Sequence, residues 1–174
     1  CRGRKLERGF MAEKEMETGK GAVTQANAIV TQLWAQCLLT KTEAETVLNN
    51  LSVAADPADR VGLKAYASLF YGLSMGTLVQ FFEKIPLENG TNAVFSSRAD
   101  ALQRVITILE SADVDLGATN PSAKFLTKVP AGIDIKSTIK ALLARYYNIQ
   151  SMITGTYNSV AGNKAMTYAA GTST

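Results

Sequence analysis

The feature that most constrains the fold of this chain is a run of 18 residues, Ala65 to Phe82, without a charged side chain. Such a run is either a helix buried at the centre of a helical domain or a membrane span. At about 1.5 Å per residue it reaches roughly 27 Å, which is short for a bilayer core. The sequence therefore favours a buried central helix. Gly72 and Gly76 in this run would let a second helix approach closely.

Apolar residues recur at three- and four-residue steps along most of the chain, whereas strand-like alternation is scarce. We therefore expect an all-α fold of about five helices. The first apolar stripe runs from Val23 to Leu38. Thr42 and Glu45 have capping-box spacing, which predicts that this helix breaks and restarts near Thr40.

Capping residues mark the starts of the later helices. Asp56 followed by Pro57 predicts the central helix, from Pro57 to about Phe82. Ser97 with Asp100 opens the next helix, and Asp134 caps the one after it. The last helix is expected over about Tyr157 to Ala169.

The segments 83–95 and 118–133 read as long irregular loops, and loops of this length are often functional. For domain organisation we expect a tether over 1–21, a helical domain over 22–170 and a frayed tail over 171–174. The run Ala65–Phe82 belongs to the helical domain.

The chain contains no histidine, which removes Ser-His-Asp and Cys-His catalysis and an ordinary zinc site. No glycine-rich phosphate loop is present, and most acidic residues lie at helix starts or on polar faces. We therefore expect no enzyme, no catalytic residue, no metal and no cofactor. A net charge of +3 is too small to indicate a nucleic-acid partner. The string from Asn89 to Thr91 matches a glycosylation sequon, a weak three-residue signal.

The first residue is Cys1, which fits either a chain cut at a cysteine or the lipidated cysteine of a mature bacterial lipoprotein. The basic residues that follow fit either a solvated terminal segment or a stretch lying against anionic lipid heads. Cys37 lies among apolar residues and is expected to be a buried small hydrophobe.

Several aromatic residues are candidates for binding. Trp34 would offer a sugar-stacking platform if exposed, but its apolar stripe favours a core position. Tyr146 and Tyr147 are adjacent on one helix, so at most one is expected to face the core squarely. Trp34 and Tyr147 are the ligand-binding candidates. Phe81 and Phe82 end a helix beside a loop, where at least one is expected to be exposed to a partner.

Four stretches together resemble the SusD/RagB-like proteins. Lys64–Tyr71, continuing to Phe81–Leu87, resembles the family's helix that ends in an aromatic residue, a short turn and Pro-Leu. Ala101–Leu116 is similar to its helix that ends in Asp-Leu, and Ile139–Tyr147 to its "KAALLARvY" helix. The spacing of Tyr157, Ala161 and Ala165 resembles the tetratricopeptide pattern that these proteins contain.

This resemblance implies tetratricopeptide-like helix pairs and a non-enzymatic surface lipoprotein of Bacteroidetes-type bacteria. Such proteins cap TonB-dependent outer-membrane transporters and bind glycans or other nutrients, and their mature chains begin with a lipidated cysteine, as Cys1 would be. Two features depart from the family pattern: basic residues follow Cys1, and the chain is much shorter than the family norm.

Two functional hypotheses follow. In the first, the chain is a lipid-anchored, non-catalytic helical scaffold in the bacterial cell envelope that docks on an integral membrane protein complex. Its expected contact residues are Phe81, Phe82, Glu83, Lys84 and Ile85. In the alternative, it is a SusD-like glycan- or nutrient-binding protein that partners a TonB-dependent transporter.

Overall fold

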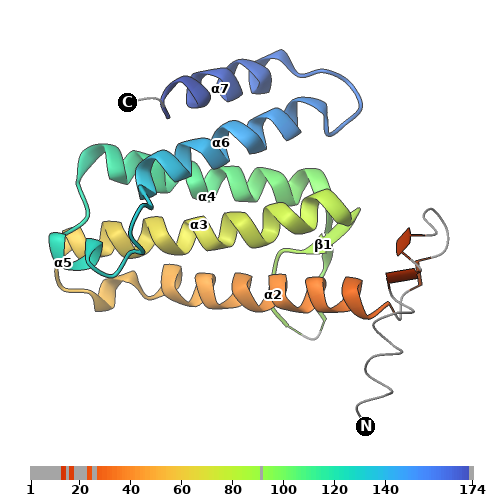
Figure 1. Cartoon of the computed structure of the whole chain (residues 1–174), viewed down its shortest axis with the longest axis horizontal. Helices are drawn as coiled ribbons and strands as arrows, with labels where there is room; N and C mark the ends of the chain where they lie inside the picture. Colours follow the sequence, from red (N-terminus) through yellow and green to blue (C-terminus); the bar gives the residue numbers. More distant parts are fainter. Residues whose placement is uncertain (1–12, 15, 18–22, 25–26, 91, 173–174) are drawn as a thin grey trace, which may run out of the picture. The chain divides into compact units, whose positions relative to one another are not determined.

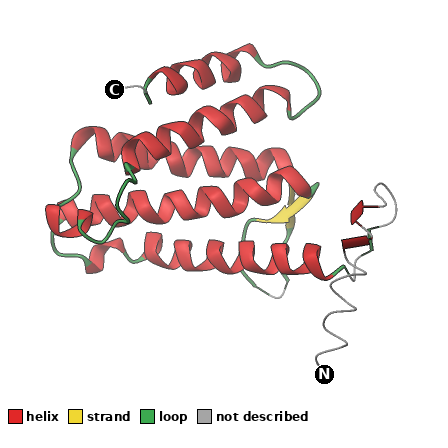
Figure 2. Ribbon diagram, in the orientation of Figure 1, coloured by secondary structure: helices red, strands yellow, loops and turns green. Residues whose placement is uncertain are grey.

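The computed structural model describes residues 13–14, 16–17, 23–24, 27–90 and 92–172 (Figure 1). The chain divides into two compact units, Cys1–Leu39 and Thr40–Thr174. The described residues form helices almost throughout, and strand is confined to one short hairpin (Figure 2). The all-α fold expected from the sequence is confirmed. Cys1, and the predicted boundary between residues 21 and 22, lie outside the described residues.

Helix α2 spans Ala28–Asn49 without interruption, so the predicted break near Thr40 is wrong. The Thr42 hydroxyl does not cap a helix, because it donates a hydrogen bond to Asn89 Oδ1. Asn27 caps the helix, since its Oδ1 accepts hydrogen bonds from the backbone N–H groups of Ile29 and Val30. A single 3₁₀ turn, η1 (Leu51–Val53), follows α2.

Helix α3 spans Pro57–Phe81 and starts as predicted, with the Asp56 side chain accepting from the Ala58 N–H at 2.9 Å. Its uncharged run supplies much of the core of the second unit, including Ala65, Leu69 and Met75. Among the described residues, no helix is both long enough and apolar enough to cross a bilayer. The burial of these side chains confirms the interpretation of this run as a buried helix.

A small antiparallel hairpin joins α3 to α4 (Arg98–Ala118). Strand β1 (Lys84–Pro86) pairs with β2 (Phe95–Ser97) in the register Lys84↔Ser97, Ile85↔Ser96 and Pro86↔Phe95. The irregular loop predicted over 83–95 is therefore shorter than expected, because β1 and β2 occupy its two ends. Strands of three residues are too short to show the alternation by which strands are recognised.

The second long loop also contains regular structure. Helix α5 spans Ala123–Leu126 and is capped by Ser122, whose hydroxyl donates a short hydrogen bond to Asp59 of α3. The Phe125 ring lies where a side chain at Gly62 would otherwise be. A one-turn helix carries too few residues to show a periodic apolar pattern, so the sequence did not reveal it.

Helix α6 (Ile135–Met152) packs against α3 and α4, and α7 (Ser159–Ala170) packs against α6 (Figure 1). Asp134 caps α6 as predicted, whereas Asn158 caps α7 one residue after the predicted start at Tyr157. The close approach predicted at the two glycines is confirmed. The Leu109 side chain of α4 lies beside Gly72, and the Tyr146 ring of α6 covers Gly76.

Candidate functional site

An open polar groove of about 490 Å³ is formed by α4, α6 and α7. Most of its lining side chains bear hydrogen-bonding groups. They are Asp100, Gln103, Glu110, Tyr147, Gln150, Thr154, Asn158 and Lys164. Gln150 Nε2 donates to Gln103 Oε1 at 2.6 Å across the groove. This volume lies within the range typical of small-molecule sites.

Three side chains from three helices meet in this groove. The Tyr147 hydroxyl of α6 donates to Glu110 Oε1 of α4 at 2.5 Å. Lys164 Nζ of α7 donates to the same Glu110 oxygen at 3.1 Å and to the Tyr147 hydroxyl oxygen at 2.8 Å. The ammonium group also lies 4.8 Å from the centre of the Tyr147 ring. The three residues therefore tie α7 to the rest of the second unit.

This arrangement shifts two pKa values away from neutrality. Burial and the hydrogen bond to Glu110 raise the pKa of Tyr147 to about 12. The hydrogen bonds to Tyr147 and then to Glu110 raise the pKa of the Lys164 ammonium group above its ordinary value. At neutral pH the phenol keeps its proton and the lysine keeps its charge. Neither group is tuned for proton transfer, which requires a pKa near the working pH.

The structure places the ligand-binding candidate Tyr147 at the wall of this groove, but buries it. Tyr168 stacks on it with ring centroids 5.8 Å apart, so the ring is already engaged by protein. The expectation that only one of the adjacent tyrosines faces the core was wrong, because Tyr146 is buried as well. Helix α6 has neighbours on more than one side. Tyr146 forms a hydrogen bond with α3, whereas Tyr147 forms hydrogen bonds with α4 and α7.

The expected contact residues at the end of α3 are only partly exposed. Phe81 is 67% exposed, and Glu83 and Lys84 are exposed as well, whereas Phe82 is half-buried. Ile85 is fully buried, so its assignment as a contact residue was wrong. The pleat of β1 turns this side chain inward.

The hairpin adds apolar side chains that the sequence analysis did not select. Val94 is 78% exposed and Phe95 is 55% exposed. We call Phe81, Val94 and Phe95 the hairpin surface, since all three lie at the end of α3 or on the hairpin that follows it. Two exposed phenylalanines, one at the end of α3 and one on the hairpin that follows it, are a more informative feature than one exposed apolar side chain elsewhere.

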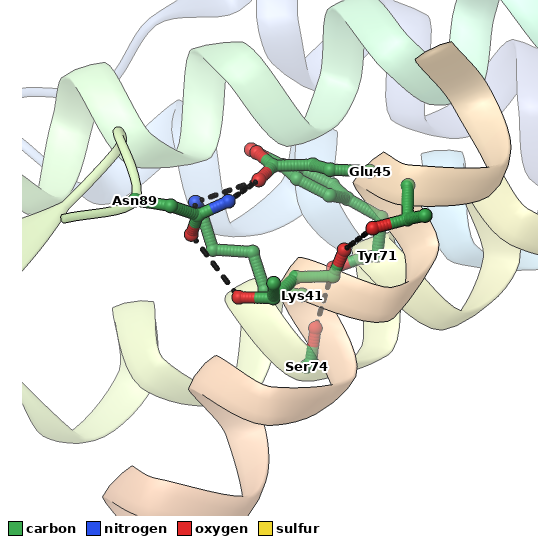
Figure 3. Close-up of polar contacts among 7 residues, drawn as sticks. Lys41, Glu45, Tyr71, Ser74 and Asn89 are labelled. Atoms are coloured by element: carbon green, nitrogen blue, oxygen red, sulfur yellow. Dashed lines mark hydrogen bonds and ion pairs between the residues drawn. The ribbon is translucent and has the colours of Figure 1, made fainter. Parts of the chain in front are cut away.

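A second polar cluster holds the hairpin against the second half of α2 (Figure 3). Lys41 is fully buried, and its Nζ lies 3.0 Å from Glu45 Oε2 and 2.9 Å from Asn89 Oδ1. Asn89 Nδ2 in turn donates to Glu45 Oε2 at 2.6 Å. A buried lysine charge is costly unless it is paired and hydrogen-bonded, and this cluster supplies one ion pair and two hydrogen bonds.

Both polar atoms of the Asn89 side chain are thus engaged within the cluster, although the residue heads the glycosylation sequon noted above. A sugar on Nδ2 would replace one of its two hydrogens and add bulk beside the hydrogen bond to Glu45. The sequence did contain a signal for part of this cluster, since Lys41 and Glu45 are four residues apart on one helix. Nothing in it pointed to Asn89 as the third member.

Two predicted residues lie outside these sites. Trp34 is half-buried on α2, within the Cys1–Leu39 unit. Cys37, in the same unit, is buried as expected. The lipidation candidate Cys1 lies outside the described residues.

Among the described residues, no group of three or more Cys, Asp or Glu side chains is arranged to hold a metal ion. Comparison of the chain with protein-family models, with curated proteins and with solved structures found no match. The resemblance to SusD/RagB-like proteins therefore remains a prediction.

Proposed function

We propose that this chain is a non-catalytic, lipid-anchored helical subunit of the bacterial cell envelope that docks on a larger membrane protein complex. The observation that carries the proposal is the hairpin surface. Its aromatic residues Phe81 and Phe95 are more than half exposed on a connection that α3, α4 and the Lys41 cluster hold in place.

Exposed aromatic side chains on a rigid support suit a docking role. Aromatic residues are enriched at the centres of protein interfaces because they bury a large area at a small cost in side-chain entropy. The surrounding charges would form a polar rim. Glu83 pairs with Arg98 at 3.2 Å, and its side chain is 84% exposed. Lys84 is exposed beside it.

The proposed anchor is Cys1, and the resemblance to SusD/RagB-like lipoproteins supports it. A diacylglyceryl group on the Cys1 sulfur would carry two acyl chains, which is enough for stable attachment to a membrane. The basic residues after Cys1 would add attraction to anionic lipid heads. Intact-mass measurement of the native protein tests the anchor, because lipid on Cys1 adds several hundred mass units.

Site-specific photo-crosslinking tests the docking surface. A photoreactive phenylalanine analogue at residue 81 or 95 of the full chain, in its native cells, should form a crosslink to one membrane protein. The same analogue at Met166, which is 64% exposed on α7, is the control. Equal crosslinking at all three positions, or none at 81 and 95, would count against the proposal.

A second candidate function is the binding of a glycan or another polar nutrient, together with a TonB-dependent transporter. The polar groove favours it, because amide and carboxylate side chains are well suited to hydroxyl groups. The buried and stacked position of Tyr147 weakens it, since no open aromatic face is offered there.

A glycan array with the full chain tests this second function. A hit should be lost on Gln150→Ala, which removes a groove amide, and kept on Gln32→Ala, which removes an exposed amide from α2. Binding that survives Gln150→Ala equally well would place the ligand elsewhere. An array without hits would leave docking as the only proposed function.

A further inference from the structure

A separate polar pocket lies where the end of α2 and η1 meet α3 and α4, away from the hairpin surface and the polar groove. Its volume is about 210 Å³, equivalent to roughly seven water molecules. Three apolar side chains form part of its wall. The polar lining comes from Glu45, Asn49, Lys64, Ser68, Arg104 and Ser111.

The charges in this pocket do not balance. Lys64 Nζ pairs with Asp115 Oδ2 at 2.6 Å. Glu45 Oε2 is engaged by both Lys41 and Asn89. The Arg104 side chain is exposed and makes no ion pair in the described part of the chain. One positive charge therefore remains without a carboxylate partner.

Hydrogen-bond donors are also in excess around Arg104. The side chains of Asn49 and Ser111 line the pocket and make no side-chain hydrogen bond with other described residues. Ser68 is fully buried in the pocket wall, and its hydroxyl has no hydrogen-bond partner there. Burying the Ser68 hydroxyl without a partner is costly, and the donors of Arg104, Asn49 and Ser111 are exposed and open to an acceptor from solution.

We propose that this pocket binds a small monocarboxylate, with its carboxylate group on the Arg104 guanidinium. The planar guanidinium matches a carboxylate in a two-bond geometry. A single uncompensated charge suits a monoanion. A doubly charged phosphate would exceed the single unpaired positive charge of the pocket, and the volume is below that of a drug-sized site. Asn49 and Ser111 would donate to the carboxylate or to a hydroxyl group next to it. This inference does not depend on the docking function.

Titration of the isotope-labelled full chain with sodium acetate and sodium lactate, followed by amide NMR at constant ionic strength, tests the proposal. Resonances around residues 49, 68, 104 and 111 should shift with a dissociation constant of about 1 mM, as expected for so small a ligand. Arg104→Gln should weaken binding at least tenfold. The matched control is Arg145→Gln, on an exposed arginine of α6 that donates to Gln80; it should bind normally.

If Arg104→Gln does not fold, Ser111→Ala and Asn49→Ala are tested in its place. Each of these variants should weaken binding about two- to fivefold. The absence of shifts up to 50 mM acetate would overturn the proposal, and so would shifts that persist in Arg104→Gln. Inorganic phosphate should shift these resonances less than acetate does at equal concentration. An equal or larger response to phosphate would mean a general anion site and would contradict the carboxylate assignment.

Discussion

The Tyr146 hydroxyl of α6 donates a hydrogen bond to the backbone carbonyl oxygen of Gly72 on α3, at 2.7 Å. The ring reaches that carbonyl across Gly76, where it occupies the space that a β-carbon would need. Both residues are buried, and the contact joins helices 74 residues apart in the sequence. The missing side chain at residue 76 is thus what allows α6 to lie against α3.

Gly76→Ala should therefore destabilise the protein. The new methyl group would overlap the Tyr146 ring, and overpacking of a core typically costs about 1–3 kcal/mol of unfolding free energy. Urea unfolding followed by circular dichroism measures the change. Gly117→Ala on α4 is the control, because a β-carbon there meets nothing within 4 Å. It should stabilise the protein by about 0.5–1 kcal/mol. Equal effects of the two changes would contradict the packing described here.

Stability should fall steeply between about pH 10 and pH 12. Burial is the main cause that raises the pKa of Tyr71, Tyr146 and Tyr147 from the ordinary 10 to about 12. The raised folded-state values contribute stability that is fully present below pH 10 and is lost as the pH approaches 12. Between pH 9 and pH 11.5 the free energy of unfolding should fall in both proteins, and the fall should be about 2 kcal/mol smaller for Tyr146→Phe than for the wild type. Urea unfolding of both proteins at the two pH values tests this. An equal loss of unfolding free energy in the wild type and in Tyr146→Phe would contradict it.

Lys41→Met should destabilise the protein by about 2–3 kcal/mol, because it leaves Glu45 without its cationic partner. Hydrogen exchange should become faster in the segment around Asn89, which would lose one of its hydrogen bonds to α2. Lys124→Met, on the exposed face of α5, should change stability by less than about 0.5 kcal/mol. A Lys41→Met protein with unchanged exchange around Asn89 would show that the cluster does not hold the hairpin.

Lys164→Met should loosen α7. The lysine joins α7 to both Glu110 and Tyr147, whereas the buried residues of this helix are small. Amide exchange in 159–170 should rise several-fold while exchange in α3 stays constant. Lys136→Met, on the exposed side of α6, is the control. A uniform rise over all helices would mean global destabilisation in place of local opening.

The sequence predicted the helices well because they are long and capped. The starts at Pro57 and Ile135 follow from Asp56 and Asp134, whose side chains bond the first turn directly. Thr42 misled the prediction, since its spacing to Glu45 matches a capping box although the hydroxyl is used by Asn89, 47 residues away. A local rule cannot anticipate a distant partner.

The sites were less predictable than the helices. Phe81 was identified because it ends a helix beside a proline-containing turn, but Val94 and Phe95 lie on strands or turns too short to recognise. Tyr147 was identified as an aromatic residue on a helix. Its partners Glu110 and Lys164 lie 37 and 17 residues away and come together only when three helices pack. Side-chain clusters of this kind depend on tertiary packing.

Isolation of the tagged full chain from native envelope membranes most directly tests the central claim. The wild type should co-purify with one integral membrane protein in fixed proportion. Phe81→Ser combined with Phe95→Ser should lose this partner while remaining folded, and Met166→Ser should retain it, because that exposed side chain lies on α7. Retention of the partner by the double variant, or purification of the wild type without any membrane protein, would contradict the account.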